Sequence, residues 1–503
     1  MLVLVAAVPA AATDAFVCYK TRASSGAATF PGATVPVTDE LGTRSLDVKK
    51  PRHLCVPADL GGGIADPAVS LRGYKARPAR GSAPYAAETA VQVLGPFGEH
   101  WLGRKAKPKL LLVPAATDPA APPPVPDPSG HDVDHFRCHR ARPSAAGPAL
   151  PAGTEVTVGD ALTETRRFAV RKAAHLCDPV DALGLPIEHP ATALACYTLG
   201  RLPNEPRHAG VDGLHVATHL GADRLDTAKE VELCVPSRAI ARCNGHAEFC
   251  DRPFDGVSYA TAHNAMSNAE EGWLAPNQTF GVTRQLDDGI RALMLDTWYF
   301  GGDAVLCHAG DLFPCDLTGM KPLADGLAEI KAFLDRRPNE VVSIIFESYV
   351  SEADTEADFI ASGLLPLTHV QSASDPWPPL RELLAAGTRL VVFTDDGGVS
   401  LPWHHYVWDH AWETHFSAQA PGDFSCAKNR GSLSNSLFIL NHFLTKPVAL
   451  PNLAEMVNHD PFFVERALQC QAESGFLPNF VTVDFYDIGD VFHVVDVLNG
   501  VAP

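Results

Sequence analysis

Pairs of cysteines at nearly constant separation dominate the first half of the chain. The separations are 37 residues between Cys18 and Cys55, 39 between Cys138 and Cys177, and 38 between Cys196 and Cys234. Similar residues surround them, since the first cysteines open segments such as CYKTR and CHRAR and the second ones lie in HLCVP, HLCDP and ELCVP. A segment that recurs at a fixed period folds as a repeated structural unit.

A fourth copy of the repeat lies between the first two and lacks both cysteines. Its opening segment, GYKAR, has Gly73 at the first cysteine position, and its closing segment, LLVP, has Leu112 at the second. Both thiols are lost together, as expected of a bonded pair. We therefore predict three disulfides: Cys18–Cys55, Cys138–Cys177 and Cys196–Cys234. Each is expected to stabilise the fold by roughly 3–4 kcal/mol in the chain-entropy model.

Short segments rich in Val and Thr lie between the repeat cysteines and are broken by Gly and Pro. This composition predicts the β-strands of small modules. The Pro-rich stretch ATDPAAPPPVPDPSG predicts a stiff, extended linker. The predicted organisation is a first pair of β-rich repeats over residues 13–115, a linker over 116–131 and a second pair over 132–240.

Cysteine content and charge restrict the compartment and the partners. Twelve cysteines, an even number, are typical of an oxidising compartment. Residues 1–12 are apolar and end in small residues, which predicts a signal peptide remnant, too short for the ~20 apolar residues that span a bilayer. A formal net charge of −19 argues against nucleic acid or an anionic surface as the main partner. We expect a secreted protein, extracellular or periplasmic, that is not an integral membrane protein.

Cys243 and Cys250 mark the boundary between the two halves. Their seven-residue separation around Asn-Gly suits a tight disulfide loop, and metal binding is the alternative. No second pair of Cys or His with zinc spacing accompanies them, which favours the disulfide. The second domain is predicted over residues 243–503.

From Phe254 onwards, short apolar runs alternate with helical segments. Residues 321–335 predict a helix because their apolar side chains recur on one face, and residues 341–346 form the continuous apolar run of a buried parallel strand. About 250 residues of such units is the size of a TIM barrel. The predicted fold class is α/β, a TIM-type (β/α) barrel preceded by β-rich, disulfide-stapled repeat modules.

Polar residues follow several of these apolar runs at the point where each run ends. They are His263, Asn264, Asp296, His308, Glu347, Asn441 and Asp484. The strand ends of a parallel barrel meet at one mouth, so these side chains are expected to converge. Two histidines and several carboxylates suit phosphoryl chemistry, in which one imidazole removes a proton from an attacking hydroxyl and the other protonates the leaving oxygen. A cation then stabilises the charge that develops on the phosphate.

The ordered set resembles the X domain of phosphatidylinositol-specific phospholipase C, a member of the PLC-like phosphodiesterase superfamily. The resemblance rests on His263-Asn264, on LMLDTW around Asp296, on LCH ending at His308 and on SIIFE ending at Glu347. GIRALMLD and PNFVTVDFY are similar to segments of secreted X-domain-containing proteins of plants and bacteria. The resemblance covers Cys243 to about Gly500 and none of the first 240 residues. It implies a TIM barrel with phospholipase C activity.

The resemblance implies a role for each matched residue. His263 is expected to be the general base on the inositol 2-hydroxyl, and His308 the general acid for the diacylglycerol oxygen. Asp484 is expected to orient one imidazole, that of His263.

The resemblance extends to four cysteines, placed like Cys243, Cys250, Cys307 and Cys315. The latter two are expected to close the loop after His308. Cys426 and Cys470 are then left to pair with each other.

Metal binding is also implied by the resemblance. Asn264, Asp296 and Glu347 match three positions that hold calcium in metal-dependent members of the family. The fourth position is usually Glu and is Met294 here, and a thioether is a poor ligand for a hard cation. Metal-independent bacterial members place an Arg two residues after the matching Asp, where this chain has Trp298. We expect a divalent cation, Ca²⁺ or Mg²⁺, held by the three protein ligands and water.

The predicted function is a phosphoric diester hydrolase that cleaves a phosphoinositide-type lipid, or a glycan-inositol substrate at a membrane surface, to diacylglycerol and a cyclic inositol phosphate. The enzymatic alternative is a sphingomyelinase D or a glycerophosphodiesterase, which normally keep the Glu that Met294 replaces. The non-enzymatic alternative is a pseudoenzyme that binds headgroups or glycans. The pair His263 and His308 favours catalysis, and the altered ligand set favours the pseudoenzyme.

Overall fold

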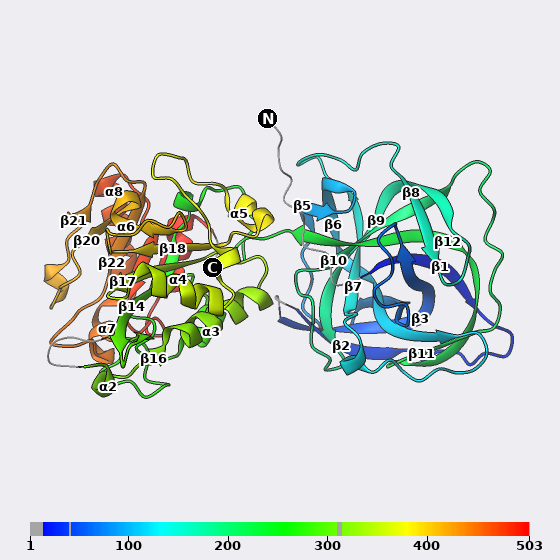
Figure 1. The fold of residues 1–503 in the computed structure, drawn as a ribbon, viewed down its shortest axis with the longest axis horizontal. Helices are drawn as coiled ribbons and strands as arrows, with labels where there is room; N and C mark the ends of the chain where they lie inside the picture. Colours follow the sequence, from blue (N-terminus) through cyan, green and yellow to red (C-terminus); the bar gives the residue numbers. More distant parts are fainter. Residues whose placement is uncertain (1–13, 40–41, 309–313, 502–503) are drawn as a thin grey trace. The chain divides into compact units, whose positions relative to one another are not determined.

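The computed structural model describes residues 14–39, 42–308 and 314–501, so the predicted signal peptide remnant at 1–12 lies outside the described residues. The chain divides into two compact units, residues 1–241 and 242–503 (Figure 1). In the described part of the first unit strands dominate, whereas strands and helices alternate in the second. None of the described helices is long and apolar enough to cross a membrane.

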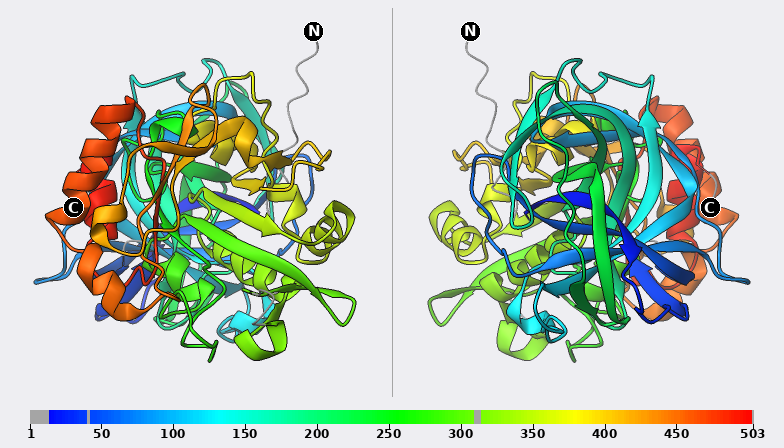
Figure 2. Two further views of the ribbon diagram at one scale, coloured as in Figure 1. Left: turned by 90° about the vertical axis from the view of Figure 1, so that its left-hand side faces the viewer. Right: turned by 90° about the vertical axis from the view of Figure 1, so that its right-hand side faces the viewer.

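The first unit forms one twelve-stranded sheet. Its elements are β1 (Ala15–Ala23), β2 (Ala33–Asp39), β3 (Gly42–Asp59), β4 (Ser70–Pro78), β5 (Glu88–Gly95), β6 (Gly98–Asp118), η1 (Pro128–Gly130), β7 (His135–Pro143), β8 (Glu155–Asp160), β9 (Arg166–Ala182), β10 (Ala193–Arg201), β11 (Leu214–Thr218) and β12 (Gly221–Ile240). The strands β1, β3, β4, β6, β7, β9, β10 and β12 pair antiparallel in this order, and β12 returns to β1. The sheet is therefore closed into a ring (Figure 2).

The ring explains the spacing of the repeat. Each copy supplies two ring strands, and its two cysteine positions face each other across that pair. The opposed pairs are Cys18 and Cys55, Cys138 and Cys177, Cys196 and Cys234, and, without sulfur, Gly73 and Leu112. All three predicted disulfides are confirmed, as are Cys243–Cys250, Cys307–Cys315 and Cys426–Cys470.

The Pro-rich stretch does not separate the repeats into two modules, contrary to the expected linker over 116–131. Strand β6 continues to Asp118, and β6 pairs with β7, so strands from both pairs of repeats share one sheet. The physical reason is closure. Each copy supplies two strands, and an eight-stranded ring that leaves no sheet edge needs all four copies.

The second unit follows the predicted alternation of strands and helices. Its strands are β13 (Tyr259–Ala262), β14 (Ala292–Phe300), β15 (Asp303–Leu306), β16 (Lys321–Pro322), β17 (Val342–Ser348), β18 (Leu390–Thr394), β19 (His404–Tyr406), β20 (Ala411–Thr414), β21 (Lys428–Gly431), β22 (Leu437–Asn441) and β23 (Phe480–Val483). Its helices are η2 (Phe254–Gly256), α1 (Val282–Asp288), α2 (Cys315–Thr318), α3 (Leu323–Arg336), α4 (Glu352–Ala361), η3 (Leu365–Leu367), α5 (Leu380–Ala386), α6 (Val407–His410), η4 (Pro421–Asp423), α7 (Pro451–Val457), α8 (Phe462–Ser474) and α9 (Val491–Asn499).

Eight strands of this unit run parallel in chain order. The strands β13, β14, β17, β18 and β19 are successive neighbours, β20, β22 and β23 follow, and β23 pairs with β13. Within the described residues no pairing joins β19 to β20, which α6 connects directly. Helix α3 buries Leu323, Leu327, Ile330, Phe333 and Leu334 in the same core as residues of β14 and β17. The unit is a mixed α/β fold whose parallel strands end on one side.

Candidate active site

Two neighbouring parallel strands end in the same way and bring the first two site residues together. Strand β13 is followed by His263 and Asn264, and β23 is followed by Asp484 and Phe485. Asn264 (φ 44°) and Phe485 (φ 48°) both adopt the left-handed conformation, which is strained for a bulky residue such as Phe. The chain therefore turns sharply at both strand ends, directly after His263 and Asp484.

The imidazole of His263 is fixed on several sides. Its Nδ1 donates to Oδ1 of Asp484 over 2.9 Å, and the side-chain amide of Asn277 donates to the same oxygen over 3.0 Å. The ring of Phe443 stacks on the imidazole with centroids 3.9 Å apart and planes 11° apart. Asp484 is buried, with 4% of its surface exposed. The hydrogen bonds from His263 and Asn277 orient its carboxylate. The Nε2 atom of His263 has no hydrogen-bond partner among the described residues.

His308 reaches the site by a route that differs from the prediction. The apolar run before it is β15, which pairs antiparallel with β14 and is not one of the parallel strands. The turn at Gly301-Gly302, where both residues have positive φ, reverses the chain. The hairpin thus returns His308 to the level of Asp296, whose carbonyl accepts from the backbone N–H of Cys307 over 3.1 Å.

His308 has a carboxylate partner of its own. Its Nδ1 donates to Oδ2 of Asp296 over 2.8 Å, and the side-chain amide of Asn264 lies 2.9 Å from the same nitrogen. Asn264 directly follows His263, so the two histidines lie at one site. Burial lowers the pKa of His308, but the hydrogen bond and charge of Asp296, with the charges of Glu347 and Asp484, outweigh it and raise the pKa above the ordinary value. The imidazolium form of His308 is therefore favoured.

A cavity of about 110 Å³ opens beside these residues. Its lining includes five of the seven strand-end residues that the sequence predicted to converge, namely His263, Asn264, Asp296, Glu347 and Asn441, whereas His308 and Asp484 are not among the lining residues. Met294 lines the same cavity, at the position where the resemblance implied a fourth metal ligand. Asp395, which follows β18, adds a carboxylate; burial first and then the charge of Glu347 raise its pKa.

Trp298 and Tyr349 stand at the edge of the carboxylate group. Their rings stack with centroids 4.0 Å apart, and the Tyr349 hydroxyl donates to Oε1 of Glu347 over 2.7 Å. Tyr349 is 50% exposed. An aromatic pair therefore occupies the place where metal-independent relatives were expected to carry an arginine, and it leaves the charge of Glu347 uncompensated.

The oxygen donors that line the cavity fit a hard divalent cation in chemical type. They include the amide oxygen of Asn264 and the carboxylates of Asp296, Glu347 and Asp395, while the carboxylate of Glu413, which also lines the cavity, accepts from Arg430. The charges also fit, because Arg430 is the only lysine or arginine among the residues that line this acidic cavity. A phosphate would meet net negative charge there unless a cation were bound.

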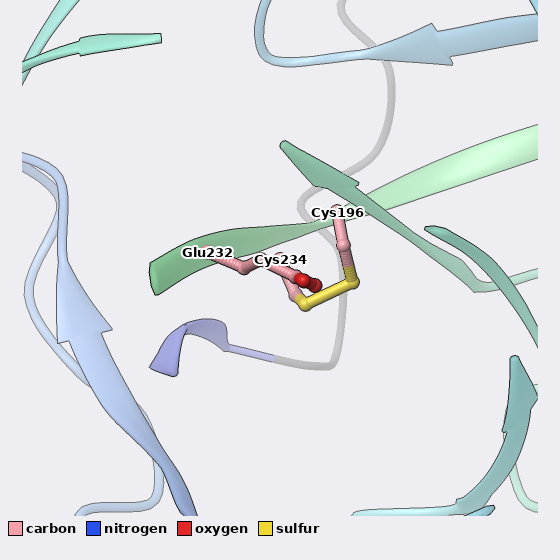
Figure 3. A group of neighbouring side chains, drawn as sticks. All are labelled: Cys196, Glu232 and Cys234. Atoms are coloured by element: carbon pink, nitrogen blue, oxygen red, sulfur yellow. A yellow bond between two sulfur atoms is a disulfide. The ribbon is translucent and has the colours of Figure 1, made fainter. Parts of the chain in front are cut away.

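A second group of possible ligand atoms is excluded as a metal site. Among the described residues, one oxygen of Glu232 and the sulfurs of Cys196 and Cys234 lie within 4.8 Å of one another (Figure 3). The two sulfurs are joined in a disulfide, so neither is available as a thiolate. Among the described residues, the carboxylates of Asp296, Glu347 and Asp395 do not form a group this tight.

Several residues at the site were missed from the sequence. Glu413 and Arg430 line the cavity, and Nε of Arg430 donates to Oε1 of Glu413 over 2.5 Å. Asp395 follows a strand end and was available to the same rule that found Glu347. Asn277 lies in a loop without periodic pattern, so no local signal marks it. The side-chain amide of Asn441 donates to Oε2 of Glu413 over 2.9 Å and to the carbonyl of Thr414 over 2.8 Å.

Comparison with known proteins places the second unit in a family. The PI-PLC X family model, described as PI-PLC X 1, matches residues 249–499. A PI-PLC X domain-containing protein of Arabidopsis thaliana is 31% identical over 272 residues, which cover 49% of this chain and 63% of the relative. An uncharacterized secreted protein of Arthroderma benhamiae is 30% identical over 290 residues, covering 52% of this chain and 64% of the relative. The chain thus spans less than two thirds of the length of these two relatives.

A third relative is matched over nearly its whole length. PI-PLC X domain-containing protein 1 of Arthroderma benhamiae is 30% identical over 303 residues, which cover 56% of this chain and 96% of the relative. Among solved structures, two forms of phosphatidylinositol-specific phospholipase C from Staphylococcus aureus align with TM-scores of 0.36 and 0.35. They are 12% and 13% identical, and each alignment covers 50% of this chain and 94% or 95% of the other. The family match and the three relatives agree, and this chain belongs to the PI-PLC X domain family.

Proposed function

We propose that the second unit is a phosphodiesterase of the phospholipase C kind that cleaves a phosphatidylinositol-like lipid to diacylglycerol and a cyclic inositol phosphate. One observation carries the proposal: each histidine of the site has its own carboxylate, His263 with Asp484 and His308 with Asp296. Two imidazoles with separate partners suit two different proton transfers.

The first proton transfer is assigned to His263. Its Nδ1–H is held by Asp484, so Nε2 carries the lone pair and is free to accept a proton. Nε2 removes the proton of the inositol 2-hydroxyl, whose oxygen then attacks the phosphorus within the same molecule. Phe443 and Asn277 keep the ring and the carboxylate in the orientation that this step needs.

The second transfer is assigned to His308. As the bond between phosphorus and the diacylglycerol oxygen breaks, His308 donates its Nε2 proton to that oxygen. The raised pKa of His308 keeps the proton available before the step. The products are a cyclic phosphodiester of inositol and diacylglycerol, and both histidines have exchanged protonation states.

A divalent cation would be held by Asn264, Asp296 and Glu347 with water, and Asp395 stands beside them. When bound, it supplies positive charge against the non-bridging phosphate oxygens. On the other side of the cavity, Arg430 and Glu413 offer a donor and an acceptor suited to sugar hydroxyls.

We further propose that the parallel strands form a TIM-type barrel whose ring is interrupted between β19 and β20, with the site at the carboxyl ends of the strands. An extracellular or periplasmic location is supported by the six disulfides and by the secreted relative.

Product analysis tests the proposal. The protein is incubated with phosphatidylinositol, sphingomyelin or glycerophosphocholine, with Ca²⁺, with Mg²⁺ or with a chelator. Cyclic inositol phosphate from the first substrate is the expected result. Turnover of only the other two would instead assign a sphingomyelinase D or a glycerophosphodiesterase. Headgroup binding without turnover of any of the three would assign the pseudoenzyme, which the replacement of a ligand by Met294 favours.

A further inference from the structure

Charge is distributed very unevenly between the two units. Residues 1–241 contain 26 of the 40 Lys and Arg and 24 of the 59 Asp and Glu, a balance of +2. Residues 242–503 contain the other 14 basic and 35 acidic residues, a balance of −21. The negative charge of the chain therefore comes from the second unit, and basic residues are abundant in the first.

Many of these basic residues recur at the same place in the repeat. Each of the four long strands carries exposed Lys or Arg shortly before its second cysteine position: in residues 49–52 of β3, 105–109 of β6, 171–172 of β9 and at Lys229 of β12. Two residues after the first cysteine position, three of the copies carry Lys20, Lys75 and Arg140, all exposed. We call these residues the basic belt.

The strand register places the belt at one level of the ring. Lys20 lies opposite His53 on one side and opposite Lys229 on the other. Lys75 faces Leu110, and Arg140 faces His175. Since these positions are two residues from the cysteine positions, they lie one step beyond the disulfides on the same face of each strand. The belt residues therefore all lie beyond the level of the disulfides, toward the same end of the ring.

The strand pairing is irregular in two of the segments that carry belt residues. The register between β3 and β4 shifts around Pro51, and that between β6 and β7 shifts around Pro108. Such bulges bend a strand and add a residue to it, and Pro is tolerated there because the ladder is already interrupted. Residues 49–52 and 105–109 therefore present several cations where a regular strand would present fewer.

The belt cations are not neutralised within the described part of the chain. None of their side chains forms an ion pair there, and Glu230 and Glu232, which follow Lys229 in β12, bind other partners. Glu230 pairs with Arg166 over 2.8 Å, and Glu232 accepts from Nδ1 of His175 over 2.9 Å. The belt residues therefore keep their positive charge unpaired within the described part of the chain.

We propose that the basic belt docks the protein on a membrane surface that bears anionic lipid. Lys and Arg near such a surface contribute additively to binding, roughly fivefold in the partition coefficient for each. The inference rests on the proposed function to this extent: a lipid substrate requires the enzyme to reach a membrane, and the strongly acidic second unit does not favour an anionic surface. The belt supplies the attraction that this unit lacks.

The composition of the surface favours lipid over a protein or nucleic acid partner. Among the described residues of the first unit, Val125 is the only large hydrophobic side chain that is strongly exposed. Protein interfaces depend on buried aromatic and apolar anchors, and single-stranded nucleic acids need aromatic platforms for stacking. A surface of lysine and arginine alone suits long-range attraction to a charged plane.

Vesicle co-sedimentation tests the proposal without turnover. The full chain is mixed with vesicles of phosphatidylcholine alone or of phosphatidylcholine with phosphatidylserine, a lipid without inositol, so that a failure of docking is distinct from a failure of the proposed lipase activity. Three belt residues, one from each of three long strands, are reversed together in Lys49→Glu, Lys107→Glu and Lys172→Glu. Three exposed basic residues of the second unit are reversed in the matched control, Arg336→Glu, Lys428→Glu and Lys446→Glu.

The unaltered chain is expected to bind the phosphatidylserine vesicles and not the neutral ones, with binding that weakens as salt increases. The belt variant is expected to lose at least about 100-fold in partition coefficient, and the control much less. Replacement of the same three lysines by Gln is expected to cause an intermediate loss of binding. A loss that follows the change in charge excludes misfolding as its cause. Equal losses in belt and control variants, or equal binding to neutral vesicles, would overturn the proposal. Retention on sulfated polysaccharide without binding to the vesicles would also overturn it.

Discussion

Asp296 and His308 form an ion pair across the β14–β15 hairpin, with Oδ2 of the carboxylate 2.8 Å from Nδ1 of the imidazole. Asp296 also lines the cavity in which a cation is proposed. One carboxylate thus adjoins both the proposed general acid and the proposed cation. The protonation of His308 is expected to depend on the state of Asp296.

The pKa of His308 is the first test of this pair. In metal-free protein, NMR titration is expected to show a pKa above the ordinary value of 6.5, because the charge of Asp296 stabilises the imidazolium. Asp296→Asn is expected to lower it, whereas Asp303→Asn, in the turn of the same hairpin, is the matched control. The Asp296–His308 pair also adds to the free energy of unfolding. This contribution is fully present below pH 6.5 and is lost as the pH rises through the pKa of His308 in the folded protein. An unchanged titration in Asp296→Asn would contradict the assignment.

Asp484→Asn is expected to lower kcat by at least about 100-fold with little change in KM, because the amide no longer fixes the tautomer and orientation of His263. Asp487→Asn, an exposed carboxylate three residues on, serves as control and is expected to retain activity. Steady-state kinetics on phosphatidylinositol measure both. If Asp484→Asn raised KM and left kcat unchanged, Asp484 would be a binding residue and not the partner of a base.

Met294→Glu is expected to strengthen divalent cation binding by about tenfold or more, since it adds a carboxylate to the proposed ligand set. Isothermal titration calorimetry with Ca²⁺ gives the affinity independently of activity, and Met294→Leu is the control for side-chain volume. An unchanged affinity for Ca²⁺ in Met294→Glu would mean that no cation binds between Asn264, Asp296 and Glu347.

Gly73→Cys with Leu112→Cys is expected to form a fourth disulfide, because these residues face each other in the same register as the three native pairs. Its expected effect is to raise the free energy of unfolding of the first unit by about 2 kcal/mol. Thiol counting on the unfolded protein checks the bond, and thermal unfolding with and without reductant checks the stability. Two free thiols in the folded variant would show that the four copies are not equivalent at this level.

The repeat and the strand-end pattern made most of the fold predictable. Cysteine separations determined the partners because the two positions of each copy are cross-strand neighbours, and Gly73 with Leu112 fit the same register. The role of the Pro-rich stretch was not predictable, since closure of the ring depends on β6 pairing with β7 across that stretch. Local composition carries no information on such a contact.

The candidate site was predictable where a polar residue directly follows an apolar strand in the sequence. His263, Glu347 and Asp484 are at or just beyond the ends of parallel strands, as the apolar runs before them indicated. Asp296 lies in the middle of β14, near the end of the parallel pairing of β14 with β17, because β14 continues to Phe300 as the first strand of the hairpin. His308 was placed correctly in the site for a different reason, because it ends the return strand of a hairpin.

Arg430 and Asn277 were not predictable. Arg430 belongs to a strand that pairs antiparallel at the edge of the sheet, and Asn277 belongs to a loop. Their approach to the site depends on tertiary packing, which leaves no periodic signal in the sequence.

Replacement of the oxygen between phosphorus and diacylglycerol in phosphatidylinositol by sulfur tests whether His263 acts as the base and His308 as the acid. A thiolate leaves without protonation, so the sulfur substrate needs a base but no acid. We predict that His308→Ala is nearly inactive on the oxygen substrate and recovers by about 100-fold or more on the sulfur substrate, whereas His263→Ala is inactive on both. Equal recovery of the two variants, or recovery of neither, would contradict the assignment of one imidazole to each end of a single phosphoryl transfer.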